Sequence, residues 1–174
     1  RFGEAIDVWE ELLLDCQRVL GADHSVTLTV RNNLAGAYDS VGRFGEAIDV
    51  WEELLLDCQR VLGADHSVTL TVRNNLAGAY DSVGRFGEAI DAWEELLPDC
   101  QRVLGADHPV TLTVRDNFVG RLDEVIDALE KLLPDCQRVL GREHPLTKQV
   151  EKNLEAAKRK MNPPDALSPE TGED

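Results

Sequence analysis

Hydrophobic residues recur every three or four positions along this chain, and that spacing is typical of amphipathic α-helices. The clearest stripe covers residues 44–62, and Gly63 is expected to end that helix. A second helix is predicted over about residues 68–83. Its start is marked by Ser67 and, in a later copy, by Pro109, because serine caps helices and proline is tolerated in their first turn. No segment has the alternation of a strand, so the pattern predicts an all-α fold.

This two-helix pattern is repeated. Residues 1–42 and 43–84 are identical, a third copy begins at Arg85, and a fourth, more divergent copy begins at Arg121. The identity extends to surface positions, which packing alone does not fix, so it indicates a recent duplication or an engineered array. One unit is too small to bury its own hydrophobic face, and the units are therefore expected to stack on one another.

The order of small and large residues in the unit resembles the tetratricopeptide repeat signature. The residues that carry the resemblance are Leu34, Ala35, Tyr38, Gly42, Phe44, Ala47, Trp51 and Leu54. The 42-residue unit, with VLGADHS or VLGADHP and then RNNLA, is similar to the long repeats of kinesin light chains and of related bacterial regulatory proteins. The resemblance implies a right-handed α-α superhelical solenoid of helix hairpins. In the family's helix order the chain starts with the second helix of a truncated repeat, and it starts at Arg1, so we expect an excised piece of a longer protein.

The expected domain organisation is an array followed by a tail. Residues 1–160 are predicted to form the array, with units starting at residues 1, 43, 85 and 121. A helix at about 144–160 is expected to cap it, because Lys148 places a charge where the previous copy has Leu112. Residues 161–174 are acidic and rich in proline, and they predict a flexible tail. Helix bends are expected at Pro98 and Pro134.

Six residues are missing between the third and fourth units, where RDNFVGR replaces RNNLAGAYDSVGR. Two outcomes follow. In one, a short helix over about 109–119 turns at Gly120 and the chain folds back as a monomer. In the other, one helix continues toward Leu133, exposes apolar residues and swaps onto a second chain through residues 114–133. The retained Val-Gly-Arg turn and the capping helix favour the hairpin and the monomer.

Charge excludes several classes of partner. The chain has 33 acidic and 18 basic residues and a net charge of −15, so it is expected to repel nucleic acids and anionic membranes. No apolar run is long enough to cross a bilayer. The four cysteines occur once per unit and form no CxxC pair, so we expect buried, reduced thiols, which fit a cytoplasmic protein.

No set of residues predicts catalysis or a cofactor. One histidine stands in the same loop of each unit, and histidines spaced in this way cannot converge on one metal ion. We expect them to order the start of a helix. The carboxylates of Glu46, Asp49, Glu53 and Asp57 follow the polar face of one helix, which indicates a solvated ridge rather than an acid–base pair. Trp9, Trp51 and Trp93 lie in apolar stripes and are expected to pack between helices. The chain also lacks a phosphate-binding loop, a catalytic triad and a zinc-protease motif, so no enzyme is expected.

The candidate binding residues lie on the second helix of each unit, where the resemblance implies a concave groove that holds extended peptides. Asparagine both donates and accepts hydrogen bonds, so the repeated Asn33, Asn75 and Asn117 suit a peptide backbone. The alternative is that these amides bond to neighbouring helices or water. Arg31 and its copies are expected to form intramolecular ion pairs. The predicted ligand-binding residues are Thr29, Asn32, Asn33, Ser40, Thr71, Asn74, Asn75, Ser82, Asp116 and Asn117.

The expected partner is a protein or peptide with some basic residues. Asp39, Asp81 and Asp116 make the groove mildly acidic. Chaperone-binding members of the family hold a C-terminal carboxylate with lysines, and the matching positions here carry Thr29, Asn32 and Gly36, so chaperone tails are not expected. The leading hypothesis is a protein-interaction scaffold. The alternative is a structural or oligomerisation array within a larger regulatory protein, with the groove unused.

Overall fold

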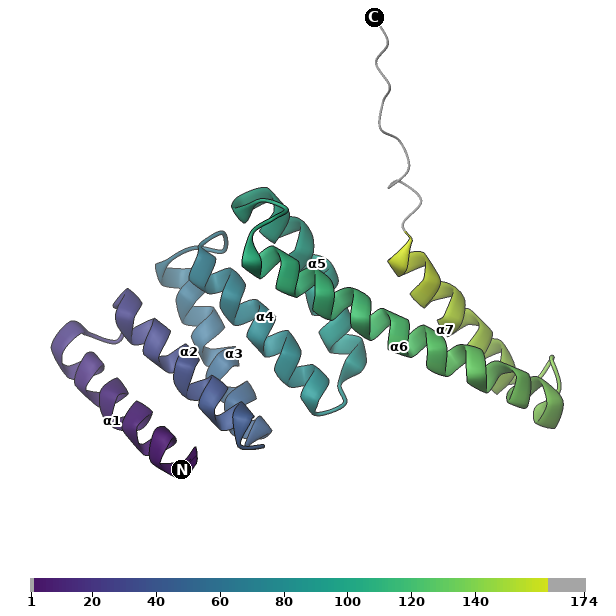
Figure 1. Cartoon of the computed structure of the whole chain (residues 1–174), viewed down its shortest axis with the longest axis horizontal. Helices are drawn as coiled ribbons and strands as arrows, with labels where there is room; N and C mark the ends of the chain where they lie inside the picture. Colours follow the sequence, from purple (N-terminus) through teal and green to yellow (C-terminus); the bar gives the residue numbers. More distant parts are fainter. Residues whose placement is uncertain (1, 163–174) are drawn as a thin grey trace, which may run out of the picture. The chain divides into compact units, whose positions relative to one another are not determined.

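The computed structural model of the chain describes residues 2–162, which contain seven α-helices (Figure 1). They are α1 (Phe2–Leu20), α2 (Ser25–Ser40), α3 (Phe44–Val61), α4 (Ser67–Ser82), α5 (Phe86–Leu104), α6 (Pro109–Leu140) and α7 (Pro145–Met161). Residues 2–162 contain no strand, so the prediction of an all-α fold is confirmed. The tail predicted for residues 161–174 lies, from residue 163 onward, outside the described residues.

The chain divides into two compact units, Arg1–Asn117 and Phe118–Asp174. In the first unit each helix from α1 to α4 packs against the next one along the chain, and α2 also contacts α4. The pairs α2–α3 and α4–α5 are successive copies of the predicted two-helix repeat. Each pair presents its first helix to the first helix of the next pair, so polar residues on α2 and α4 become neighbours.

A histidine, and not the predicted serine, caps the first helix of each pair. Nδ1 of His66 accepts a hydrogen bond from the N–H of Val68 at 3.2 Å, and Ser67 is already the first helical residue. Two residues further, the hydroxyl of the fully buried Thr69 donates to the carbonyl of Gly63 at 2.8 Å. The same cap is present at His24, His108 and His144. The expectation that the histidines order helix starts is therefore confirmed.

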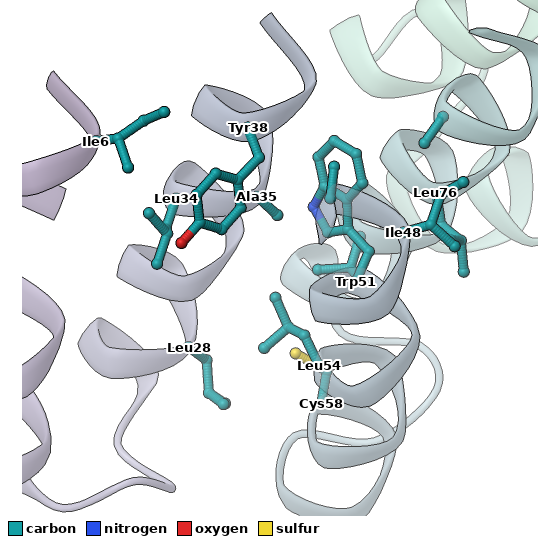
Figure 2. Close-up of a cluster of buried hydrophobic side chains, with 13 residues drawn as sticks. Ile6, Leu28, Leu34, Ala35, Tyr38, Ile48, Trp51, Leu54, Cys58 and Leu76 are labelled. Atoms are coloured by element: carbon teal, nitrogen blue, oxygen red, sulfur yellow. The ribbon is translucent and has the colours of Figure 1, made fainter. Parts of the chain in front are cut away.

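The core lies between the paired helices (Figure 2). Leu28 of α2 and Leu54 of α3 are fully buried there, and Trp51 packs beside them. Trp51 and Trp93 are each 3% exposed, which confirms that they pack between helices, whereas Trp9 is half-buried. Burying large aromatic side chains contributes a large share of the stability of such pairs.

The predicted burial of the cysteines is confirmed at three of the four positions. All four are free thiols; three are buried and the last, Cys136, is half-buried. Burial raises the pKa of the Cys58 and Cys100 thiols above their ordinary value, so both stay protonated and unreactive near neutral pH.

The predicted hairpin at Gly120 is wrong, because α6 continues through Gly120 as one helix. In an earlier unit the same Val-Gly-Arg sequence ends α4, with Gly84 in the left-handed region at φ +80°. There the N–H of Arg85 donates to the carbonyl of Tyr80 at 2.9 Å, and the guanidinium lies 4.1 Å from the centre of the Tyr80 ring. The six missing residues include this tyrosine, so the stacking of the arginine on a tyrosine ring cannot form at the retained Val-Gly-Arg sequence of α6.

The second unit contains α7, close to the predicted capping segment 144–160. Within this unit Lys158 pairs with Glu130 at 2.6 Å, and the side-chain amide of Gln137 donates to Glu151 at 3.0 Å. Its role as a cap stays a prediction. The helices α5 and α6 continue through their internal prolines, and the bends expected there stay predictions as well.

Candidate functional site

A cavity of about 340 Å³ opens beside the first helices of successive pairs, within the unit Arg1–Asn117. Amides and small residues form most of its wall. Its lining residues are Gly36 and Asp39 of α2, Trp51 of α3, Asn74, Asn75, Gly78, Ala79 and Ser82 of α4, and Asn117 of α6. The cavity therefore combines hydrogen-bonding groups with the edge of an indole ring.

Two glycines keep this cavity open. A Cβ atom at Gly36 would lie 4.0 Å from Cζ2 of Trp51, so any larger side chain would occupy the space beside the indole ring. A Cβ at Gly78 would meet nothing within 4 Å, so it would point into free volume. Neither glycine has a positive φ, and each therefore matters for the room it leaves rather than for its backbone conformation.

The asparagines form an amide ladder between the helices. Oδ1 of Asn32 accepts from Nε1 of Trp51 at 2.9 Å and from Nδ2 of Asn75 at 3.0 Å. One unit later, Oδ1 of Asn74 accepts from Nε1 of Trp93 at 3.2 Å and from Nδ2 of Asn117 at 3.3 Å. The ladder is thus partly structural, as the alternative interpretation of the amides expected.

The ladder still leaves hydrogen-bonding capacity in the cavity. A primary amide has two N–H groups and one carbonyl oxygen. Among the described residues, Asn75 uses only one N–H group, in its bond to Asn32. The second N–H group and the oxygen of Asn75, in the cavity wall, are free to pair with a ligand. Asn117, which also lines the cavity, uses one N–H group in the same way.

The predicted hydroxyl groups donate within their own helices. Thr29 and Thr71 each donate to the carbonyl four residues earlier, at 2.9 Å. Ser40 donates to the carbonyl of Ala37 at 2.8 Å, and Ser82 to that of Gly78 at 3.1 Å. These hydroxyls can offer a ligand an acceptor oxygen, but their donor is already used.

The structure brings together four of the ten predicted binding residues in this cavity. They are Asn74, Asn75, Ser82 and Asn117. The other six, Thr29, Asn32, Asn33, Ser40, Thr71 and Asp116, do not line it. The predicted ligand-binding residues did not include Trp51, Ala79 or the two glycines, and Asp39 was expected only to make the groove acidic. Asp39 and Gly36 lie on the polar side of the helix pattern, but Trp51 belongs to the apolar stripe and is 3% exposed, so the sequence gives no signal that its ring lines the cavity.

Asp39 is the charged group of the cavity. Its Oδ1 atom is buried, and among the described residues it accepts no hydrogen bond. Burial raises the pKa of Asp39, because no neighbouring cation offsets the cost of removing the carboxylate from water. The protein itself therefore leaves this carboxylate without a compensating charge.

The arginines next to the ladder belong to the scaffold. Arg31 pairs with Asp57 at 2.6 Å, which confirms the expected intramolecular ion pair. Asp57 also pairs with Arg60, and Arg60 pairs with Asp23 at 2.7 Å. The network therefore connects α3 with α2 and with the loop before α2. The two guanidinium groups hold the pKa of Asp57 below its ordinary value. The next unit repeats the network with Arg73, Asp99, Arg102 and Asp65.

In residues 2–162 no group of three or more histidine, cysteine or acidic side chains could hold a metal ion. None of the helices α1 to α7 is long and apolar enough to cross a membrane.

Comparison with known proteins finds one matching family model and several similar solved structures. The family model of the tetratricopeptide repeat matches residues 27–67 and 69–110. A kinesin light chain-like protein of Podosopora anserina with nearly identical TPR-like repeats is 24% identical, with a TM-score of 0.63 over 91% of this chain and 78% of that chain. A single-residue variant of that protein has a TM-score of 0.64 at the same identity and coverage. BtubC (BKLC) from P. vanneervenii is 23% identical, with a TM-score of 0.62 over 91% of this chain and 66% of that chain. No curated protein sequence matches the chain significantly.

Proposed function

We propose that the chain is an array of tetratricopeptide repeats and that its amide-lined cavity binds an extended segment of a protein or peptide. Arrays of this fold are all-α solenoids that mediate protein–protein interactions. The single observation that carries the proposal is the position of Asn75 and Asn117. Both line the cavity, and both keep amide groups that can pair with a peptide backbone.

The charge of the cavity favours a basic side chain in the ligand. The carboxylate of Asp39 lies in the wall without a compensating cation, and the whole chain has a net charge of −15. A lysine or arginine beside Asp39 would supply the missing charge, and electrostatic attraction would also speed association. The indole edge of Trp51 offers an apolar surface for the stem of such a side chain. The free thiols fit a proposed cytoplasmic location.

Residues 1–42 and 43–84 are identical, so the same substitution can be made once inside the cavity and once outside it as a control. Arrayed peptides of different net charge are screened for binding, and the affinity of the best peptide is measured by calorimetry. Asn75→Ala should weaken binding about tenfold, since one or two hydrogen bonds are lost. Asn33→Ala removes the same residue from the identical sequence on α2, where it does not line the cavity, and should leave affinity unchanged.

Two results would contradict the proposal. One is equal loss of affinity in both variants, because the cavity would then not be the site. The other is the absence of any specific peptide, which would support the second candidate, a structural array with an unused groove. The bond between Asn75 and Asn32 is the observation that favours that second candidate. Circular dichroism of each variant verifies that its helices are intact.

A further inference from the structure

A second cavity, of about 390 Å³, lies between three consecutive helices of the unit Arg1–Asn117, and we call it the leucine-lined cavity. Its volume is at the lower end of the range of ligand sites, so it suits one long side chain better than a large ligand. Its lining residues are Leu55 and Gln59 of α3, Arg73, Leu76, Ala77 and Tyr80 of α4, and Ala92 and Glu95 of α5.

The leucine-lined cavity and the amide-lined cavity lie on opposite sides of α4. The residues that α4 contributes to the leucine-lined cavity run from Arg73 to Tyr80 in steps of three, one and three, so they share one side of the helix. At about 100° per residue, the residues that α4 contributes to the amide-lined cavity are centred about 180° away. A ligand in one cavity therefore leaves the other accessible, and the inference below does not rest on the function proposed above.

An alanine at position 92 helps to keep the leucine-lined cavity open. Each lining residue has a copy 42 positions earlier in the chain, and seven of the eight copies are the same type of residue. The exception is Val50, the copy of Ala92, which packs against the hydrophobic core. Valine has two more carbon atoms than alanine, so a valine at position 92 would fill part of the cavity.

The cavity has an apolar interior and a polar edge. Leu76 and Ala77 are buried, and Leu55 beside them is half-buried. Gln59 and Glu95 are exposed. A side chain with an aliphatic stem and a polar end matches this arrangement, because the stem covers the apolar residues while the end stays close to water.

One of the two charged residues of the cavity lacks a partner. The guanidinium of Arg73 pairs with Asp99 at 2.7 Å. Glu95 forms no ion pair and no hydrogen bond among the described residues, whereas its copy Glu53 lies 3.8 Å from Arg31. The uncompensated charge of the cavity is therefore negative and favours a cationic ligand.

Tyr80 adds no charge to the cavity. Its hydroxyl donates to Glu52 at 2.8 Å. Burial, together with this bond, raises the pKa of Tyr80 to about 12, so the phenol stays protonated near neutral pH. The hydroxyl proton is already used, and the acceptors left at the edge are the carboxylate of Glu95 and the side-chain oxygen of Gln59.

We propose that the leucine-lined cavity binds a lysine side chain of a partner protein. The stem of the lysine lies on Leu55, Leu76 and Ala92. Its ammonium group pairs with Glu95 and donates to the side-chain oxygen of Gln59. Among basic side chains lysine has the longest aliphatic stem, which suits the apolar interior. The net charge of −15 attracts a basic partner from a distance.

The test uses the whole 174-residue chain, with the methyl groups of its alanines labelled for NMR. The probes are two blocked tripeptides with lysine or norleucine between two glycines, which share the stem and differ in the ammonium group. The signal of Ala92 is identified because it disappears in Ala92→Val. The lysine peptide should shift this signal, and the norleucine peptide should bind about two- to fivefold less tightly. Binding in the amide-lined cavity would not move the signal of Ala92, so the two proposals are tested separately.

Matched variants test the charge and the space. Glu95→Gln should weaken binding of the lysine peptide about two- to fivefold, whereas Glu53→Gln, the same change at a copy outside the cavity, should have no effect. Ala92→Val should weaken binding about tenfold, because the lysine stem then meets a filled space. In that variant the signal of Ala77, identified from Ala77→Gly, reports the affinity. Val50→Ala should give a new methyl signal that also shifts with the lysine peptide, since the other lining residues are the same there.

Three results would overturn the proposal. The first is a signal of Ala92 that does not move with the lysine peptide at any concentration. The second is equal affinity for the lysine and norleucine peptides, because the carboxylate would then have no role. The third is native affinity in Ala92→Val although circular dichroism shows that the variant is folded. If that variant does not fold, Glu95→Gln and Glu53→Gln still decide, since equal affinity in these two would place the ligand elsewhere.

Discussion

The side-chain amide of Asn75 donates to Oδ1 of Asn32 at 3.0 Å, and the same oxygen accepts from the indole of Trp51 at 2.9 Å. One oxygen atom thus joins α2, α3 and α4. The position of Asn75 in the cavity depends on this bond, so the binding surface and the packing of the array are coupled at Asn32.

Asn32→Ala should lower the free energy of unfolding by about 1–3 kcal/mol, because it leaves the buried indole N–H of Trp51 without an acceptor. Denaturant unfolding measures the loss. Asn33→Ala changes an exposed neighbour on the same helix and should cost less than about 0.5 kcal/mol. Equal values for the two variants would show that the double hydrogen bond contributes nothing to stability.

His66→Ala should destabilise the array by about 0.5–2 kcal/mol, because the N–H of Val68 loses its cap. His66→Asn should recover most of that loss, since the asparagine oxygen is also a good cap acceptor. Thermal unfolding of both variants provides the comparison. If alanine and asparagine destabilise equally, the imidazole acts through a contact other than the cap.

Asp39 and Asp57 should give opposite dependences of stability on pH. The pKa of Asp39 is raised in the folded protein, so this residue favours folding below its unfolded pKa of about 3.9 and loses that effect as pH rises through the raised value. Asp39→Asn should therefore raise the unfolding midpoint at neutral pH. The pKa of Asp57 is lowered, so its contribution is present above about pH 3.9 and is lost as pH falls through the lowered value. Asp57→Asn should lower the neutral-pH midpoint.

The same pair can be followed by urea unfolding over a range of pH. For Asp39→Asn the advantage over the native chain should shrink as the solution becomes acidic, and for Asp57→Asn the deficit should shrink. A neutral-pH midpoint that falls in Asp39→Asn would contradict the absence of a compensating cation at this carboxylate. The substitution should change stability and peptide affinity in opposite directions. Asp39→Asn should be more stable than the native chain at neutral pH but should bind a basic peptide less tightly.

Insertion of Ala-Gly-Ala-Tyr-Asp-Ser between Phe118 and Val119 should restore the turn before Arg121. The inserted tyrosine gives Arg121 the partner that Tyr80 gives to Arg85. Leu112, which is 38% exposed, would then be covered by the helix that follows in its own chain, so the free energy of unfolding should rise. Denaturant unfolding measures this rise. Six inserted alanines are the control, since they lengthen the chain without the tyrosine or glycine and should not restore the turn.

The regular part of this structure could be predicted because it repeats local patterns. The spacing around Trp51 predicted its helix and its burial, and the resemblance predicted the ion pair of Arg31, which stands where the short repeats have a bulky packing residue. The cavity depends instead on which atoms of Asn75, Gly78 and Trp51 meet in space, and an apolar stripe does not reveal that an almost fully buried ring lines a cavity. The turn at Gly120 was predicted wrongly because Val-Gly-Arg looks sufficient in sequence. In the folded array the turn also needs the contacts of Tyr80, which come from a residue several positions away.

The distribution of thiols has a practical consequence for following how the array opens. Each predicted unit has one free cysteine, and no disulfide connects them. An alkylating reagent under native conditions would label a cysteine only when the helices around it separate, so the rate at each position reports local opening. Cys136 is half-buried and should be labelled first, whereas Cys58 and Cys100 should wait for larger openings. Mass spectrometry of the labelled peptides would thus give the labelling rate of each of the four cysteines and would show where the helices separate first, without an added probe.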